Sequence, residues 1–430
     1  MNATAERTQT ATPIVANLCC DVGMADLHMI CPSLADSLFS RVFKISNKTL
    51  PIVETLTQVR DHAARLGFEV VRVVVEPTGI YHNLLLDIAR SMGMQTAMVN
   101  GEHVAKMRVV RHGDSGKTDK RDPVAISDVV DNGRIIIDRR RDFTDTFHLL
   151  RSWGYIYQAA EDGIIECKGK IHRGLKQLFP DFDFKKDFLY GRSGQAIMAC
   201  YGFDPHEIAR HAPSRLLQRL RRTSNIQKMS IPRLLASARA SVLSTPDGER
   251  REFLKLQLAQ VWEEWEMHDS RRVEARAMLE SQYDRAREHD PRLPVPEYGV
   301  ITKILLARLF AELGPLDDFG HWRQVLRYAG LNLRERESGQ YVGLVKIARK
   351  GRPQLRRLLS QIALPLVRKG CLFGVYFHQK RKVQKMAGPK AMTAVSRKIM
   401  KMIWGWYQSG AAFNAERVFM CRPDYQREAA

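Results

Sequence analysis

EVVRVVVE, residues 69–76, is the stretch that decides the fold of the first third of this chain. Five of its eight residues are valine, and a near-continuous run of β-branched side chains is typical of a strand buried on both faces in the middle of a sheet. The run ends in Glu76, so the central predicted strand carries an acid at its carboxyl end.

The segments around this strand alternate between strand and helix patterns. Upstream, three short apolar runs predict consecutive strands of a meander, and a helix follows that begins at a proline and ends before a glycine. Downstream come a helix, a further strand, a basic segment and another helix. The expected ranges are strands at Ile14–Asp21, Leu27–Cys31 and Arg41–Ile45, a helix at Pro51–Leu66, the strand Glu69–Val75, a helix at Ile80–Met92, a strand at Gln95–Val99, the basic segment Lys106–Lys117 and a helix from Thr118. This order predicts an α/β domain with a mixed sheet and covering helices over residues 1–145.

The rest of the chain shows helical patterns and no strong strand signal, so the overall fold class is α/β plus all-α. Residues 249–287 form a long, highly charged run without proline or glycine. Its imperfect heptads fit a two-helix hairpin arm or coiled coil, and an ordinary bundle helix fits equally well. Three prolines within residues 290–299 indicate a boundary. We therefore expect a helical, coiled-coil arm over residues 146–290 and a mainly helical last domain over residues 291–430.

The charge is strongly positive and unevenly distributed. The 430 residues hold 68 Lys and Arg against 47 Asp and Glu, a formal net charge of +21. Residues 321–430 hold 23 of the basic and 5 of the acidic side chains, a net of +18, which leaves +3 for residues 1–320. An ordinary metabolic enzyme is rarely so basic, and a hydrophobic content of 44% excludes a disordered basic tail. Clustered Lys and Arg bind phosphates, so we expect nucleic acid as the partner of the last quarter.

Membrane and disulfide classes are not supported. The sequence lacks the run of about twenty apolar residues that crosses a bilayer, and its N-terminus lacks the pattern of a signal peptide. Its seven cysteines are scattered without a CxxC pair, which supports neither a zinc site nor a disulfide framework. We therefore expect a cytoplasmic protein with no membrane partner and with reduced, mostly buried thiols.

Acids recur at strand ends and at a helix start in the first domain. Asp21 ends the first predicted strand and Glu76 the central one, while Asp119 and Asp122 are spaced to share one helical face. Carboxylates gathered in this way make an all-oxygen site for one or two Mg²⁺ ions, with Mn²⁺ as an alternative, and so favour phosphoryl transfer. Taken singly, each has a plainer interpretation: Asp119 as a helix-start acid, Asp122 as a solvated surface charge and Asp21 as a turn residue.

The order of elements resembles the ribonuclease H-like fold of RuvC-type nucleases. VVVEPTGIYHNLL around Glu76 and GKTDKRDPVAISDVV around Asp119 are similar to motifs of the DEDD transposases of insertion sequences, the group that includes the bridge-RNA-guided serine recombinases. The family's four acids fall on Asp21, Glu76, Asp119 and Asp122. The resemblance implies that these four are catalytic and hold the metal. Pro123, where the family usually has alanine, and the Cys-Cys pair before Asp21 depart from the pattern without removing an acid.

The last domain holds a second motif. Ser338 precedes a glycine, and a Ser-Gly pair by itself indicates a turn, here on a nucleic-acid-binding face. The serine alone does not indicate catalysis, because a serine attacks a phosphodiester only when cations or a metal activate it. The family carries Glu-Ser-Gly, then a basic glycine-containing loop and a Leu-Arg-Arg helix, matched here by residues 337–339, 349–351 and 355–357. The resemblance implies that Ser338 is the nucleophile that becomes joined to DNA. The expected nucleic-acid contacts are Arg334, Arg336, Lys346, Arg349, Lys350, Arg356 and Arg357.

Taken whole, the resemblance implies a transposase, or site-specific DNA recombinase, of an insertion sequence. It would cut and rejoin double-stranded donor and target DNA through a serine–DNA intermediate, assisted by Mg²⁺ at the four acids. The family also implies guidance by a structured non-coding bridge RNA. It further implies a homodimer that assembles into a homotetramer, in which the serine of one protomer meets the acids of another.

Two other interpretations fit the same residues. A metal-only RuvC-like nuclease or junction resolvase would attack with activated water, and Ser338 would only bind phosphate. A non-catalytic relative would keep the nucleic-acid-binding surface and lose the chemistry.

Overall fold

A computed structural model describes residues 13–35, 37–77, 79–113, 118, 121–137, 144–224, 226–297, 299–334, 337–338, 341–342, 346–368, 373–414 and 418, apart from the side chains of residues 112, 137, 144, 337, 338, 341 and 342. The chain divides into two compact units, residues 1–141 and residues 142–430. Each unit has two hydrophobic cores of its own.

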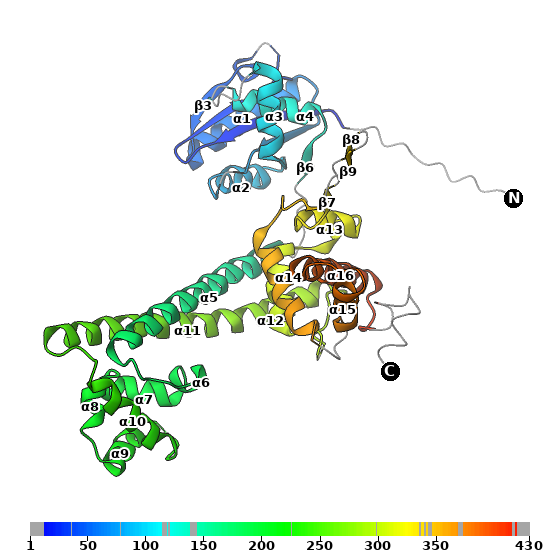
Figure 1. The fold of residues 1–430 in the computed structure, drawn as a ribbon. Helices are drawn as coiled ribbons and strands as arrows, with labels where there is room; N and C mark the ends of the chain where they lie inside the picture. The colour runs from blue at the N-terminus through cyan, green and yellow to red at the C-terminus, as the bar shows by residue number, and fades with distance from the viewer. Residues whose placement is uncertain are drawn as a thin grey trace. The chain divides into compact units, whose positions relative to one another are not determined.

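The first unit is built on a six-stranded mixed sheet with the strand order β3-β2-β1-β4-β5-β6 (Figure 1). β1 pairs antiparallel with β2 and parallel with β4, which is also parallel to β5. The valine run forms β4, in the interior of the sheet as predicted, because its side chains are apolar on both faces. The strands are β1 (Val15–Val22), β2 (Asp26–Ile30), β3 (Phe43–Ser46), β4 (Val70–Val75), β5 (Gln95–Val99) and β6 (Ile135–Ile137).

Helices cover both faces of this sheet. Alternate residues of a strand point to opposite faces, so Cys20 and Val75 lie in the core beneath α1 and α2, while Cys19 and Val74 lie in the core beneath α3 and α4. The helices are α1 (Thr49–Arg65), α2 (Asn83–Ser91), α3 (Gly101–His112) and α4 (Asp122–Asp131), with a short 3₁₀ turn at Leu38–Ser40. The predicted α/β class is confirmed for this unit.

Helix α3 and strand β6 were not predicted. The sequence pattern shows a basic segment where α3 lies, because Val104 is the one fully buried residue among the described side chains of that helix and Val109 and Val110 are exposed. Its end signals are nevertheless regular: the Asn100 side chain accepts a hydrogen bond from the backbone N–H of Glu102, and Gly113 ends the helix with φ of 71°. Strand β6, with three residues, is too short to show a period.

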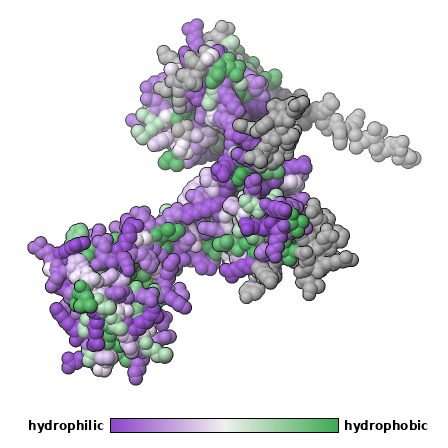
Figure 2. Space-filling model, in the orientation of Figure 1, coloured by the Kyte–Doolittle hydropathy of each residue, from purple (hydrophilic) through white to green (hydrophobic). Residues whose placement is uncertain are grey.

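The second unit contains a two-helix arm formed by α5 (Thr144–Leu178) and α11 (Glu249–His289) (Figure 1). The first half of α5 shares a core with the last half of α11, and the reverse halves share the other core, so the two helices run antiparallel. Residues 249–287 thus lie in one helix of an antiparallel pair. Figure 2 shows the arm covered mostly by hydrophilic side chains, and no helix in the described part of the chain is long and apolar enough to cross a membrane.

One end of the arm carries five short helices, here called the distal bundle (residues 186–242). Its core combines aromatic side chains of α11, Trp262 and Trp265, with Phe203 and with aliphatic residues of the bundle. The helices are α6 (Lys186–Leu189), α7 (Arg192–Tyr201), α8 (Pro205–Ala209), α9 (Pro213–Thr223) and α10 (Ser230–Val242).

The other end of the arm packs into the helical core of the last domain. Tyr407 of the last helix is fully buried and donates a 2.5 Å hydrogen bond to Asp290 at the end of α11, which also accepts from Arg292. The helices are α12 (Lys303–Leu313), α13 (Trp322–Tyr328), α14 (Pro353–Leu366), α15 (Gly374–Lys382) and α16 (Gly388–Ser409), with a 3₁₀ turn at Leu316–Asp318 and short strands β7 (Leu333–Arg334), β8 (Glu337–Ser338), β9 (Tyr341–Val342) and β10 (Lys346–Ile347).

The cysteines in the described residues are free thiols. Cys19, Cys20, Cys31 and Cys167 are buried and Cys200 is half-buried. Burial raises the pKa of the Cys19 and Cys20 thiols well above their ordinary value, so both stay protonated at neutral pH. These five side chains act as small apolar packing groups, as expected for reduced cysteines.

Candidate active site

Asp21 and Glu76 are brought together by strand register. β1 and β4 run parallel, and Cys20 pairs with Val75 as the last matched residues of the two strands. Asp21 and Glu76 follow one position later on strands that lie about 4.8 Å apart. Asp21 and Glu76 lie two positions after Cys19 and Val74, so they face the same side of the sheet, toward the core beneath α3 and α4. The single-residue interpretation of Asp21 as a turn residue is wrong, because it lies within β1 and pairs with His28 of β2.

The Glu76 carboxylate packs against the first residue of α3. A Cβ on Gly101 would overlap Glu76 Oε1 and would lie 3.3 Å from Glu76 Cδ. Only glycine lets the backbone approach the carboxylate this closely. The amino end of a helix also carries partial positive charge, which favours a carboxylate there. Gly101 thus sets the position of Glu76.

Asp122 is the first residue of α4, and its side chain is fully buried. Arg108 of α3 places its Nε 3.2 Å from Asp122 Oδ1, and the Arg108 side chain is itself only 12% exposed. A buried carboxylate is costly unless a cation or hydrogen bonds compensate it, and the Arg108 guanidinium supplies that compensation for Asp122. The single-residue interpretation of Asp122 as a solvated surface charge is wrong. A more exposed pair, Arg111 with Asp128 at 2.6 Å, links the same two helices.

The described residues contain part of the predicted acidic set. Asp119 lies outside them. Within them, no group of three or more His, Cys, Asp or Glu side chains lies close enough together to hold a metal ion. The structure therefore brings Asp21 and Glu76 together and places Asp122 on the same side of the sheet, held by Arg108. Carboxylate oxygens are the donors that Mg²⁺ prefers, so the side chains present fit that ion by donor type.

Ser338 lies in a β-hairpin of the second unit. β7 pairs with β10, and β8 pairs with β9, which lie between those two strands in the sequence, so the two ladders are nested. Ser338 is the last residue of β8. It pairs with Tyr341, at the end of the β8–β9 ladder that lies farther along the chain from β7 and β10. The Ser338 side chain, Arg336 and Gly339 lie outside the described part of the chain. The backbone therefore presents the serine at the far end of a hairpin rather than in a single loop.

Two glycines join the legs of this hairpin at its base. The Arg349 N–H donates to the Gly330 carbonyl at 3.0 Å, and the Arg352 N–H donates to the Tyr328 carbonyl at 3.1 Å. Gly351, with φ of 153°, lies so close to the other leg that a Cβ would overlap the Tyr328 carbonyl and the Gly330 nitrogen. Glycine is thus required in the basic loop because two chain segments cross closely there.

The six predicted nucleic-acid contacts in the described part of the chain fall into two groups. Arg334 and Lys346 are paired on the outer ladder and are exposed, as are Arg349 and Lys350.

Two further arginines have partners inside the second unit. Arg356 donates to the carbonyls of Ala329 and Gly351, and Arg357 pairs with Asp162 of α5 at 2.7 Å. Hydrogen bonding from Arg357 also holds the pKa of Asp162 below its usual value. These two arginines therefore stabilise the fold, and their contact with nucleic acid stays a prediction.

Three residues of the site region were not singled out by the sequence patterns. Arg108 sits within the basic segment, where nothing local distinguishes it from its neighbours. Gly101 follows a predicted strand end and an asparagine, a signal for a helix start that was available. Arg352 donates to Glu312 and to the hydroxyls of Tyr328 and Tyr155, and no local pattern predicts such distant partners.

Two family models match the chain. A DEDD model of the IS110 type, described as a transposase, matches residues 20–180, and a second, described as the transposase IS116/IS110/IS902 family, matches residues 299–378. Together they cover more than half of the chain, and they contain all four predicted acids and Ser338. The mixed sheet with acids at its strand ends and these matches define a transposase, an enzyme that processes DNA. The chain belongs to the IS110 family of transposases.

None of the curated proteins compared with this sequence matches it. The family itself implies binding to DNA and the use of a divalent metal.

Gly101→Ala tests whether the contact with Glu76 shapes a metal site. The added methyl overlaps the carboxylate, so Glu76 must move, and we expect Mn²⁺ affinity to fall by about 10- to 100-fold, the usual effect of disturbing the support of a metal ligand. Electron paramagnetic resonance of Mn²⁺ titrated into the protein measures this. Gly405→Ala is the control, because no atom lies within 4 Å of its Cβ position. Equal Mn²⁺ affinity in Gly101→Ala and the parent would contradict the assignment.

Proposed function

We propose that this transposase cuts and rejoins DNA through a covalent bond between Ser338 and a DNA phosphate, with the acids of the first unit holding Mg²⁺. The single observation that supports it most is the register of β1 and β4, which sets Asp21 beside Glu76 at the ends of two buried parallel strands. The proposed metal ligands are Asp21, Glu76, Asp119 and Asp122.

Two of these acids have a support in the first unit. Gly101 lets Glu76 rest at the amino end of α3, and Arg108 fixes Asp122 at the start of α4. Both supports come from α3, so one helix orients carboxylates from two different elements. When bound, Mg²⁺ supplies positive charge that stabilises the phosphorane-like transition state of phosphodiester cleavage.

The covalent step balances without a co-reactant. The Ser338 Oγ forms a bond to phosphorus, its proton passes to water, and the bond from phosphorus to one deoxyribose oxygen breaks, leaving a protonated hydroxyl on the DNA. In rejoining, a DNA hydroxyl attacks the phosphoserine, and Ser338 leaves with a proton. The phosphodiester energy is kept in the intermediate.

The hairpin suits this role for Ser338. The two legs of the hairpin are joined at Gly330 and Gly351, next to the β7–β10 ladder. The β8–β9 ladder, which carries Ser338, follows beyond it. Arg334 and Lys346, opposite each other on β7 and β10, offer two exposed cations to a phosphate on the approach to the serine. Cations so placed favour both the alkoxide and the charged transition state.

The proposed partners are double-stranded donor and target DNA and a structured guide RNA, bound by a homodimer that assembles into a homotetramer. The net charge of +18 in residues 321–430 supports binding to phosphate backbones. Base pairing by an RNA would then supply the sequence specificity, as in other guided systems.

Ser338→Ala separates this mechanism from a metal-only nuclease. With Mg²⁺ and a cleavable DNA, the parent is expected to form a protein–DNA adduct that survives denaturing electrophoresis, and Ser338→Ala is expected to form none, because it lacks the hydroxyl that makes the bond. Ser360→Ala, which removes a serine hydroxyl from α14, is the matched control and should form the adduct. Cleavage of DNA by a folded Ser338→Ala protein would refute the serine mechanism and favour attack by water.

Asp21→Asn and Asp119→Asn test the metal assignment. Each replaces a charged ligand by a neutral one of the same size, so cleavage should fall by at least about 100-fold, equivalent to about 2.7 kcal/mol, while DNA binding is retained. Asp128→Asn removes a carboxylate of the same unit that pairs only with Arg111 in the described structure and should cleave normally. Parent-like cleavage by both ligand variants would overturn the metal site, and a parent protein that binds DNA without cleaving it would point to a non-catalytic relative.

The guide RNA has its own test. The protein purified from cells that carry its element is expected to bring down one structured RNA encoded beside the gene, identified by sequencing of bound RNA. Recovery of only ribosomal and transfer RNA would contradict guidance and leave the cleavage chemistry untouched.

A further inference from the structure

The distal bundle is the part of the second unit to which the family resemblance gives no role. The two family matches end at residue 180 and resume at residue 299, so they do not include it. It nevertheless has a built core and sits at the end of α5 and α11 away from the last domain (Figure 1). Its surface must therefore be interpreted from its own residues.

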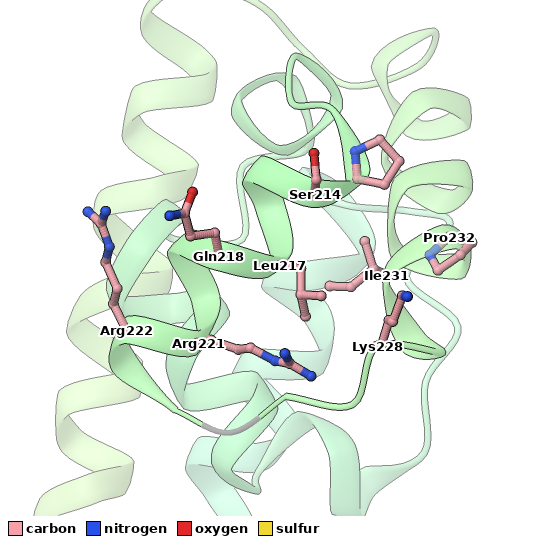
Figure 3. A pocket seen from close by; sticks show the side chains of 9 residues that line it. Ser214, Leu217, Gln218, Arg221, Arg222, Lys228, Ile231 and Pro232 are labelled. Carbon is pink, nitrogen blue, oxygen red and sulfur yellow. The ribbon is translucent and has the colours of Figure 1, made fainter.

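An open cleft of about 790 Å³ lies between α9 and α10 of this bundle. Figure 3 shows Leu217 and Ile231 facing each other across it. Arg221 reaches toward it from α9, and Lys228 from the segment before α10. Ser214 and Gln218 add neutral polar groups along α9, and Arg222 lies at the outer edge. The cleft thus has an apolar floor and a cationic rim.

The charge around the cleft is one-sided. Between Glu207 and Asp247 the chain has eight Lys and Arg residues and no acidic residue. Two of these eight have acidic partners: Arg233 pairs with Asp183, and Arg210 pairs with Glu207. Among the described residues, the rim cations Arg221, Arg222 and Lys228 have no acidic side chain within ion-pair distance.

Helix stability alone does not account for this rim. Arg221 and Arg222 lie in the last turn of α9, where cations interact favourably with the helix dipole. Lys228, however, lies beyond the helix, and it is exposed on the other wall of the same cleft. Cations converging from two elements without acidic partners are typical of a surface that binds phosphate groups.

We propose that this cleft binds the phosphate backbone of double-stranded DNA, as a second contact surface separate from the basic last domain. Duplex DNA is the polyanion that a transposase handles, and the proposal requires only this DNA binding and not the serine chemistry. The 35 residues of α5 span about 50 Å at 1.5 Å per residue. A duplex that runs along the arm would therefore be contacted about 15 base pairs beyond the last domain, at 3.4 Å per pair.

Reversal of two rim charges in the full-length protein tests the proposal. The double variant Arg221→Glu with Lys228→Glu removes two phosphate contacts, so we expect the Kd for a duplex of about 40 base pairs to rise at least about 10-fold at 0.1 M salt. The slope of log K against log salt concentration should fall by about 2. Fluorescence anisotropy of labelled DNA measures both quantities.

The matched control is Lys185→Glu with Arg192→Glu, which changes the net charge equally at exposed positions outside the cleft, one just before the distal bundle and one within it. It should change the Kd less than about 3-fold and leave the slope nearly unchanged. An equal loss in both double variants would show a general charge effect and overturn the cleft. Parent-like DNA binding by the rim variant would overturn it as well.

Two further experiments identify the ligand and test whether a loss of binding comes from misfolding. If the rim variant loses affinity for a structured RNA of equal length and keeps its affinity for DNA, the proposed occupant is wrong. Arg221→Gln with Lys228→Gln, checked by circular dichroism, gives the same comparison without adding acidic groups. Ser338→Ala should show the full effect of the rim reversal, so failure of the serine mechanism and failure of the cleft remain distinguishable.

Discussion

The parallel pairing of β1 with β4 is the constraint on which the candidate active site depends. Both strands place apolar side chains in the cores on both faces of the sheet, so their register is fixed by packing against the helices above and below. A slip of one residue would turn every side chain to the opposite face and would move Asp21 away from the side that Glu76 faces. The hydrophobic effect in the sheet thereby positions the acids, which lie at the boundary where the apolar strands end.

Ion pairs position the segments of the candidate site that strand pairing does not position. In the first unit Arg108 holds Asp122, and in the second Arg352 holds Glu312 beneath the hairpin that carries Ser338. Such pairs contribute little net stability because both charges lose hydration, but removing one partner is costly. Their consequence here is geometric: each ties a segment of the candidate site to a helix from another part of its unit.

The charge of the protein is divided more finely than its total suggests. Residues 1–320 are nearly neutral as a sum, with +3, yet they contain an acidic strand-end site and the basic run of the distal bundle. Acidic residues of the long helix α11 offset that run in any average over the arm. The net charge summed over a sequence region therefore identified the basic last domain but not the distal cleft. Electrostatic fields depend on charges that are neighbours in space, whatever their separation in the sequence.

The sequence by itself determined five strands and three helices of the first unit, its α/β class and the two acids at the ends of β1 and β4, because hydrophobic period and end signals are local. It left open whether residues 249–287 form an arm, and it marked the region of α3 only as basic. Tertiary structure alone decided that Asp122 is buried against Arg108, that α5 is the partner of α11, and that Arg356 and Arg357 bond within the fold. Those outcomes depend on contacts between residues up to 195 positions apart, which no local pattern encodes.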